Sequence, residues 1–266
     1  MARRASTSER ARQYRQEGHD NALLFALELG LGNDYRNDPQ AKKDVIDPSG
    51  DAHSVKSGKR KWQIFLYSRN RFLADDGFMA LNGIGTLLIH CIDAFPPSYQ
   101  EYRGNPAAAK ERLQTPMREL RDRLQRKALL RAFLMKSIFN GGEVNYLTVF
   151  DGDVFRVFLN KDVVQAMGEC FEVVNSKATR KGEVDDQKVL FRYKGKNVGE
   201  LEMRNDSPIH YQEVRFNMIV QPAMKLLLEK IPEACTLATS SQVIIHGNAK
   251  RRFGRWAAPK AGATQT

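Results

Sequence analysis

Apolar residues recur along the chain with two different periods, which together predict a mixture of helices and strands. A spacing of three to four residues predicts helices over 8–30, 78–95, 106–139, 160–168 and 220–230. Short runs rich in branched and aromatic residues predict strands over 44–46, 53–56, 62–67, 144–150, 154–159, 189–193, 198–204 and 210–218. Pro116 predicts a break or a first turn within 106–139. The alternation indicates the α/β class.

The composition is that of a globular protein that does not cross a membrane. The 266 residues are 42% hydrophobic and 27% charged, so the chain can bury a core without a disulfide or metal staple. The three cysteines lack CxxC spacing, which predicts reduced thiols and a cytoplasmic location. The first twenty residues lack the apolar segment of a secretory signal, and the most apolar stretch, 78–95, is too short and too polar to span a bilayer.

The charge points to a polyanionic partner. Lys and Arg number 42 against 31 Asp and Glu, which leaves a net charge of +11. The excess is concentrated in three segments, 56–71, 110–131 and 248–266. A single basic segment is commonly a solvated surface, but three of them favour nucleic acid, with an anionic membrane surface second.

Several enzyme signatures are absent from the sequence. It contains no GxxxxGK[ST] phosphate loop, complete GxGxxG, HExxH or GxSxG, and its five histidines lack metal-ligand spacing. These absences argue against a nucleotide-driven motor, a Rossmann dehydrogenase, a zinc hydrolase and an α/β-hydrolase.

The segment 44–56 holds the first candidate site. It reads as a β-hairpin in which Asp44 begins one strand and Lys56 ends the next, with Ser54 on the same face as Lys56. Such a hairpin brings a carboxylate, a hydroxyl and an ammonium to one place. Phosphodiester hydrolysis uses these groups, because carboxylates hold Mg²⁺ and a lysine stabilises charge on the reacting phosphate.

This arrangement of an acid, a hairpin and a lysine resembles the PD-(D/E)XK nuclease superfamily. Together with 44–67, the following helix and the stretch Gly199-Glu-Leu-Glu-Met-Arg-Asn-Asp-Ser207, it looks like a type II restriction endonuclease. The resemblance implies a central mixed β-sheet flanked by helices and a homodimer that cuts double-stranded DNA at a specific sequence with Mg²⁺, in the cytoplasm of a prokaryotic cell. Asp44 then matches the first metal-binding acid and Lys56 the catalytic lysine.

The implied organisation is one nuclease domain over 1–247, followed by a basic flexible tail over 248–266. A change of pattern near Gly141 offers a subdivision into a catalytic and a DNA-recognition part.

The sequence departs from the family pattern at two positions. Lys43 stands where the pattern has proline, and Ser54 stands where it has the second acid. The missing carboxylate must then come from elsewhere, and the candidates are Glu28 on the first helix, Asp47, or a glutamate of the 200–202 strand. The alternative is structural, with Asp44 and Asp47 as turn residues and Lys56 as a surface lysine.

A second cluster provides a rival metal site, made of Asp186, Glu200 and Glu202. Its structural alternative is a set of cross-strand ion pairs. DNA contact is the interpretation that we favour for the polar residues that follow it. Two stretches on either side of the 62–67 strand, 59–61 and 69–71, are further candidates for DNA contact, with a polar loop as the alternative for 69–71. The predicted DNA-binding residues are Lys59, Arg60, Lys61, Arg69, Asn70, Arg71, Arg204, Asn205, Asp206 and His210.

Two other functions are compatible with the sequence. A non-catalytic nucleic-acid-binding protein would use the basic segments to bind but would not hydrolyse phosphodiesters. A structure-directed repair nuclease would hydrolyse phosphodiesters without sequence specificity. Metal-dependent cleavage distinguishes the first from a restriction enzyme.

Overall fold

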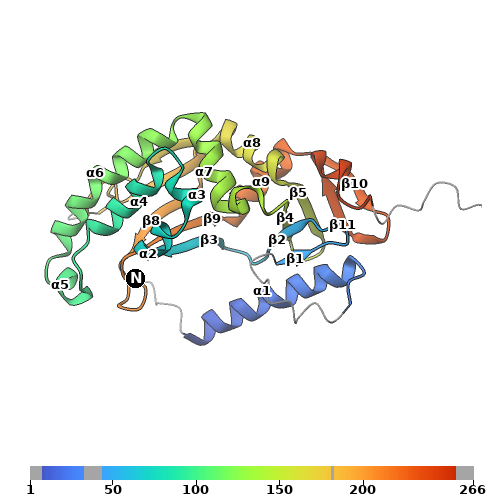
Figure 1. The fold of residues 1–266 in the computed structure, drawn as a ribbon, viewed down its shortest axis with the longest axis horizontal. Helices are drawn as coiled ribbons and strands as arrows, with labels where there is room; N and C mark the ends of the chain where they lie inside the picture. Colours follow the sequence, from blue (N-terminus) through green and yellow to red (C-terminus); the bar gives the residue numbers. More distant parts are fainter. Residues whose placement is uncertain (1–7, 33–43, 181–182, 256–266) are drawn as a thin grey trace, which may run out of the picture. The chain divides into compact units, whose positions relative to one another are not determined.

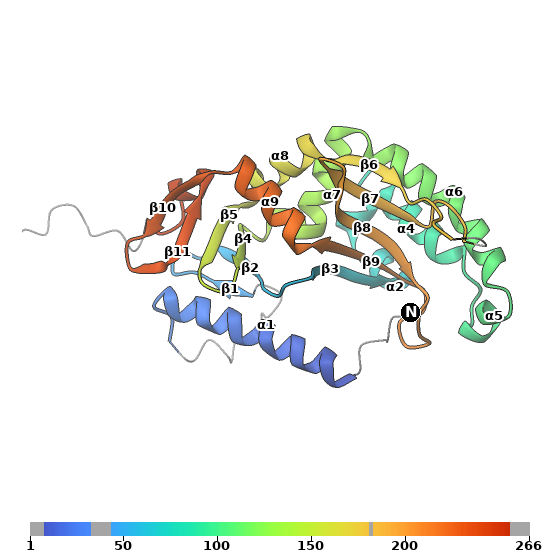
Figure 2. The same cartoon turned by 180° about the vertical axis from the view of Figure 1, so that it is seen from behind.

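The computed structural model describes residues 8–32, 44–180 and 183–255. The chain divides into two compact units (Figures 1 and 2). The first contains residues 1–58, 142–163 and 230–266, and the second contains 59–141 and 164–229. The resemblance to the nuclease superfamily implies one central mixed sheet, whereas the structure has two separate sheets, one in each unit. One of the chain's crossings between units falls at Gly141–Gly142, where the sequence pattern changes.

The first unit is built on a six-stranded mixed sheet in the order β1-β2-β4-β5-β11-β10. Strands β2 and β4 run parallel, as do β5 and β11, and the other neighbours are antiparallel. Its elements are α1 (Ser8–Glu28), β1 (Val45–Ile46), β2 (Ala52–Lys56), β4 (Tyr146–Phe150), β5 (Phe155–Leu159), β10 (Glu233–Leu237), β11 (Ser240–His246) and the 3-10 helix η3 (Gly247–Arg251). The sequence pattern does not predict β10 and β11, because exposed polar residues interrupt their apolar positions.

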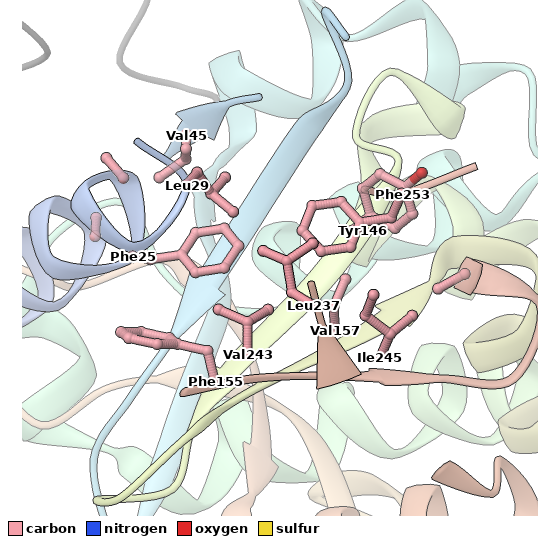
Figure 3. Close-up of a cluster of buried hydrophobic side chains, with 13 residues drawn as sticks. Phe25, Leu29, Val45, Tyr146, Phe155, Val157, Leu237, Val243, Ile245 and Phe253 are labelled. Atoms are coloured by element: carbon pink, nitrogen blue, oxygen red, sulfur yellow. The ribbon is translucent and has the colours of Figure 1, made fainter. Parts of the chain in front are cut away.

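One face of this sheet packs against α1 (Figure 3). Phe25 of α1 is fully buried, and its ring centroid lies 5.1 Å from that of Phe155 on β5. The core also contains Tyr146 and, from the end of the described chain, Phe253.

The expectation of a flexible tail from 248 is wrong for residues 248–255. Residues 248–251 belong to η3, and Phe253 after it is 2% exposed and packs against His53 and Tyr146. Burial of a phenyl ring provides the free energy that a solvated basic tail lacks. Residues 256–266 lie outside the described part of the chain.

The second unit is built on a five-stranded antiparallel sheet in the order β3-β9-β8-β7-β6. Its strands are β3 (Lys61–Ser68), β6 (Glu172–Asn175), β7 (Lys188–Tyr193), β8 (Lys196–Arg204) and β9 (Glu213–Ile219). Its helices are α2 (Arg69–Leu73), α3 (Asp76–Met79), α4 (Ile84–Asp93), α5 (Tyr99–Gly104), α6 (Pro106–Leu124), α7 (Lys127–Phe139) and α9 (Val220–Lys230). The 3-10 turn η2 (Asn140–Gly142) and helix α8 (Asn160–Cys170) span residues of both units, and the last residue of α9, Lys230, belongs to the first unit.

The two faces of this sheet differ in polarity. Helices α4, α6 and α7 cover an apolar face (Figure 1). On this face Phe133 of α7 packs against Phe191 and Phe216. The opposite face carries charged residues on β3, β7, β8 and β9.

Pro116 does not break the helix, which continues as α6 to Leu124. The helical segment divides instead at Arg126, whose extended backbone precedes α7. Within the described ranges, no helix combines the length and the apolarity that a membrane span requires.

Candidate functional site

The predicted hairpin forms in the first unit from β1 and β2, with Val45 opposite His53 and Ile46 opposite Ala52. Its turn is closed by backbone hydrogen bonds from Asp47 to Asp51 and from Gly50 to Asp47, each 2.9 Å long. Gly50 has a φ of 85°, which glycine adopts without strain. Alternation along β2 directs His53 toward the core beside Phe25, and Ser54 and Lys56 toward the other face.

The structure brings Asp44, Ser54 and Lys56 together on that other face. The Asp44 Oδ2 atom accepts hydrogen bonds from the Val55 amide at 2.8 Å and from the Ser54 hydroxyl at 3.4 Å. The same oxygen lies 3.9 Å from Lys56 Nζ. The side chains of Asp44 and Lys56 are 36% and 23% exposed, so solvent and ligands can reach both.

Asp47 lies apart from this group and has a structural role. Its Oδ1 atom accepts hydrogen bonds from the Ser49 amide at 2.8 Å, the Ser49 hydroxyl at 2.6 Å and the Asp51 amide at 3.0 Å. Its side chain is fully buried, and Oδ2 faces His53 Nε2 at 3.4 Å. Burial alone would raise the pKa of Asp47, but hydrogen bonds from His53, Ser49 and Asp51 outweigh it and lower the pKa. These partners leave Asp47 poorly placed to bind a metal.

His53 links the hairpin to strand β4, a contact that the sequence did not reveal. Its Nδ1 atom lies 2.9 Å from Thr148 Oγ1, and its ring stacks on Tyr146 with centroids 4.7 Å apart. Burial lowers the pKa of His53, although the neighbouring carboxylates of Asp47 and Asp51 oppose this shift. The neutral ring then donates from Nε2 to Asp47 and accepts the Thr148 proton at Nδ1. The hairpin is thus held to β4 by a buried polar chain.

Asp51 connects the hairpin turn to β4 and to the segment that follows η3. Its carboxylate accepts a hydrogen bond of 3.1 Å from the Tyr146 hydroxyl and pairs with Arg252. The Ala52 amide adds a hydrogen bond of 2.8 Å to Asn145. The turn of the hairpin is therefore fixed from two distant parts of the sequence.

Glu28 makes its contact with another strand of the sheet, not with the hairpin. Its carboxylate accepts a hydrogen bond from the hydroxyl of Ser240 at the start of β11. Among the described residues, no group of three His, Cys, Asp or Glu side chains is placed to hold a metal ion. In the described part of the first unit, Asp44 is the predicted metal-binding acid that contacts Lys56.

The rival cluster is a set of cross-strand ion pairs on the polar face of the second unit. Glu200 pairs with Lys61 and, at 3.2 Å, with Lys188, while Glu202 pairs with Lys188 and with Arg215. Burial raises the pKa of Glu200, but Lys61 and Lys188 oppose it and the net shift is downward. Three cations thus surround two carboxylates, which matches the structural alternative.

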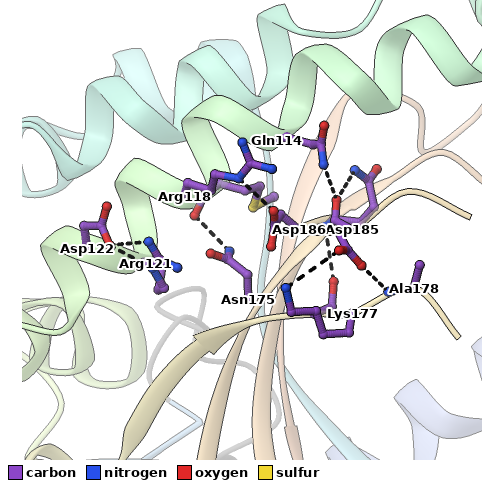
Figure 4. A network of polar contacts seen from close by, with 12 residues as sticks. Gln114, Arg118, Arg121, Asp122, Asn175, Lys177, Ala178, Asp185 and Asp186 are labelled. Carbon is purple, nitrogen blue, oxygen red and sulfur yellow. Dashed lines mark hydrogen bonds and ion pairs between the residues drawn. The ribbon is translucent and has the colours of Figure 1, made fainter.

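Asp186 belongs to a different network, shown in Figure 4. Its carboxylate accepts a hydrogen bond of 2.7 Å from Arg118 on α6. Its neighbour Asp185 pairs with Lys177 at 3.7 Å and accepts a hydrogen bond from the Ala178 amide at 2.6 Å. The three acids of the rival site are therefore not brought to one point.

The predicted DNA-binding residues lie at two ends of the second unit's sheet. Lys59, Arg60 and Lys61 are at the start of β3, while Arg69, Asn70 and Arg71 follow its end in α2. The register pairs Ser68 with Glu213 and Glu213 with Arg204, so α2 begins at the same end as the β8–β9 connection. That connection contains Asn205, Asp206 and His210.

Most charged members of this group have partners. Arg69 pairs with Asp93 at 3.0 Å, and His210 lies 2.9 Å from Glu213. Arg204 donates two hydrogen bonds to Asp206, at 2.8 and 3.0 Å. Arg71 is exposed and lies over the Tyr67 ring, 5.1 Å from its centroid.

Comparison of the chain with protein-family models, curated proteins and solved structures finds no match in any of the three.

Proposed function

We propose that this protein is a Mg²⁺-dependent endonuclease of the type II restriction class that hydrolyses double-stranded DNA. The observation that carries the proposal is the meeting of the Asp44 carboxylate, the Ser54 hydroxyl and the Lys56 ammonium on one partly exposed hairpin face. The net charge of +11 supports a polyanionic substrate.

The residues at Asp44 fit a magnesium ion of the kind that nucleases use. Mg²⁺ keeps several waters and is commonly held by one or two carboxylates together with substrate phosphate oxygens. A single carboxylate beside a lysine is therefore a sufficient protein contribution once DNA supplies the phosphate. When bound, the ion lowers the pKa of a coordinated water and offsets the charge that develops on phosphorus.

The chain's own residues then have separate roles. The Val55 amide fixes the orientation of the Asp44 carboxylate. Lys56 lies at 3.9 Å from that carboxylate, the outer limit of an ion pair, so its ammonium can also donate to a phosphate oxygen. Ser54, a buried residue whose hydroxyl donates to Asp44, stands in place of the second acid of the family pattern.

The proposed substrate contacts lie in the second unit. Arg69, Arg71, Arg204 and His210 have the side chains that bind phosphates and base edges. We expect a homodimer, since a two-fold protein matches a palindromic site.

The test is incubation of the full chain with unmethylated phage-length DNA, with Mg²⁺ or with a chelator. Discrete bands that disappear with chelator support the proposal. Asp44→Ala should lower the cleavage rate by roughly 10²-fold or more, the usual cost of a lost charge-stabilising group, while DNA affinity is kept. The matched control is Asp153→Ala, which removes an exposed acid from the β4–β5 turn of the same unit.

Three results would contradict the proposal. If Asp44→Ala cleaves DNA at an unchanged rate, the hairpin is not the catalytic site. A smear would favour a structure-directed or non-specific nuclease. Intact DNA that shifts on a gel would favour a non-catalytic nucleic-acid-binding protein.

A further inference from the structure

The connection between β8 and β9, residues 205–212, presents an apolar side chain to solvent. Ile209 is 82% exposed, whereas the other exposed large hydrophobic side chains of the described chain are 36–48% exposed. Pro208 precedes it and is also exposed. Single exposed apolar residues are ordinary on protein surfaces, so exposure alone would mean little.

The first half of this loop is held by short polar contacts. Arg204 and Asp206 form a two-bond ion pair just before the apex. The Ser207 hydroxyl accepts a hydrogen bond of 3.3 Å from the His210 amide, which closes the turn around Pro208 and Ile209. His210 is held in turn by Glu213, with 2.9 Å between Nδ1 and Oε2.

The second half of the loop is anchored to the helical layer of the same unit. The Tyr211 hydroxyl donates a hydrogen bond of 2.7 Å to the Pro96 carbonyl, and Gln212 donates to the carbonyls of Phe95 and Pro96. The Tyr211 ring also packs against Tyr99 and Tyr102. Contacts on both sides of the apex therefore keep Ile209 from folding back onto the protein.

The side chains near Ile209, in the sequence and in the strand register, are of types that contact nucleic acid. Arg204 and His210 flank it in the sequence and pair with Asp206 and Glu213. The strand register puts Arg71 of α2, and Arg69 with its partner Asp93, at the same end of the sheet. A fixed apolar tip among hydrogen-bonding groups matches the way in which apolar wedges enter duplex DNA. Such side chains, isoleucine and proline among them, insert between base steps and kink the helix.

We propose that the loop 205–212 is a wedge that inserts Ile209 between base pairs of the bound duplex. The proposal rests on the proposed function, because it needs DNA as the partner. It adds that the substrate is bound in a deformed state, so that sequences with easily unstacked steps are preferred. A second copy of the chain is a weaker candidate for the partner, since a stable protein interface buries about 800 Å² on each side and one isoleucine cannot supply that area.

The test measures DNA unwinding by the full-length protein, because insertion between base pairs untwists the duplex. Lys56→Met is introduced first so that the DNA stays intact. Closed circular plasmid is relaxed by a topoisomerase while this parent is bound, and the protein is then removed. The linking number of the plasmid is compared with that of plasmid relaxed without the parent. Affinity is measured on the same plasmid over a range of salt concentrations.

Ile209→Ala in this background should abolish the change in linking number. It should lower affinity by roughly tenfold, the expected effect of losing most of the apolar surface of one buried isoleucine. The dependence of affinity on salt should not change, because no charge is removed. Leu228→Ala, at a 41% exposed leucine of α9 in the same unit, is the matched control and should leave both properties unchanged.

The outcomes separate this proposal from the proposed function. If Ile209→Ala unwinds plasmid as the parent does, the wedge is wrong while cleavage by the unaltered protein still supports the nuclease. If the parent does not bind DNA, both proposals fail. If Ile209→Ala changes the molecular mass of the free protein by sedimentation and leaves unwinding intact, Ile209 is a self-association contact and the wedge is overturned.

Discussion

Phe253 shows how far the end of the described chain supports the hairpin, and its truncation should be strongly destabilising. The ring is 2% exposed and lies edge-on to His53, with 5.1 Å between centroids, and 5.4 Å from Tyr146. Truncation of a buried phenylalanine to alanine costs about 3–5 kcal/mol, because transfer free energy is lost and a cavity remains. Since η3 is attached to the sheet through a short segment, the cavity can partly collapse, and we expect about 3 kcal/mol for Phe253→Ala.

The assay is urea unfolding followed by far-ultraviolet circular dichroism, fitted with two transitions because the chain contains two units. The decrease in the free energy of unfolding should be confined to one transition, and the dependence of that free energy on urea concentration should not change. Arg251→Ala, at an exposed residue of η3, is the control. A loss below about 1 kcal/mol, the range of an ordinary substitution, would refute the packing of this segment against the hairpin.

Two further predictions concern titration and charge. Burial holds the pKa values of His53 and His246 below the ordinary value, so the unfolded chain binds more protons below about pH 6.5 and stability should fall as the pH drops through that value. The free energy of unfolding measured against pH should show this slope, and a His53→Gln variant with the same slope would contradict it. Lys188→Met should destabilise the second unit by roughly 1–3 kcal/mol, because it removes a cation that pairs with both Glu200 and Glu202. Loss of a fully buried ion-pair partner would cost more, but the Lys188 side chain is partly exposed to solvent. A double-mutant cycle with Glu202→Gln measures the coupling, and a coupling near zero would mean that the pair is not formed.

The hairpin was predictable because everything that forms it is local. Asp47 through Asp51 contain the turn chemistry, and alternation along 52–56 assigns Ser54 and Lys56 to one face. The approach of Asp44 to both residues then follows from the pairing of two adjacent strands. Whether these residues carry out hydrolysis stays a prediction.

The support behind the hairpin could not be predicted in this way. His53 bonds to Thr148 across 95 positions, and Asp51 pairs with Arg252 across 201. Both contacts depend on which strands become neighbours in the sheet, and a sequence pattern with a period of two does not contain that information. The same limit applies to Glu28, whose partner Ser240 lies 212 positions away.

The two acidic clusters differ in how their charge is balanced, and this difference favours one of them over the other as the proposed metal site. Strand pairing puts Glu202 directly between Lys188 and Arg215, so its charge is matched by its own sheet. A divalent cation at that point would have to displace ammonium and guanidinium groups that already satisfy the carboxylates. Among the described residues, Asp44 has one cation beside it, at 3.9 Å, and its side chain is 36% exposed, so that cation balances its negative charge only in part. A divalent cation bound to a DNA phosphate would displace fewer ion-pair partners at Asp44 than at Glu200 and Glu202. The hairpin is for this reason the better candidate for the proposed hydrolysis.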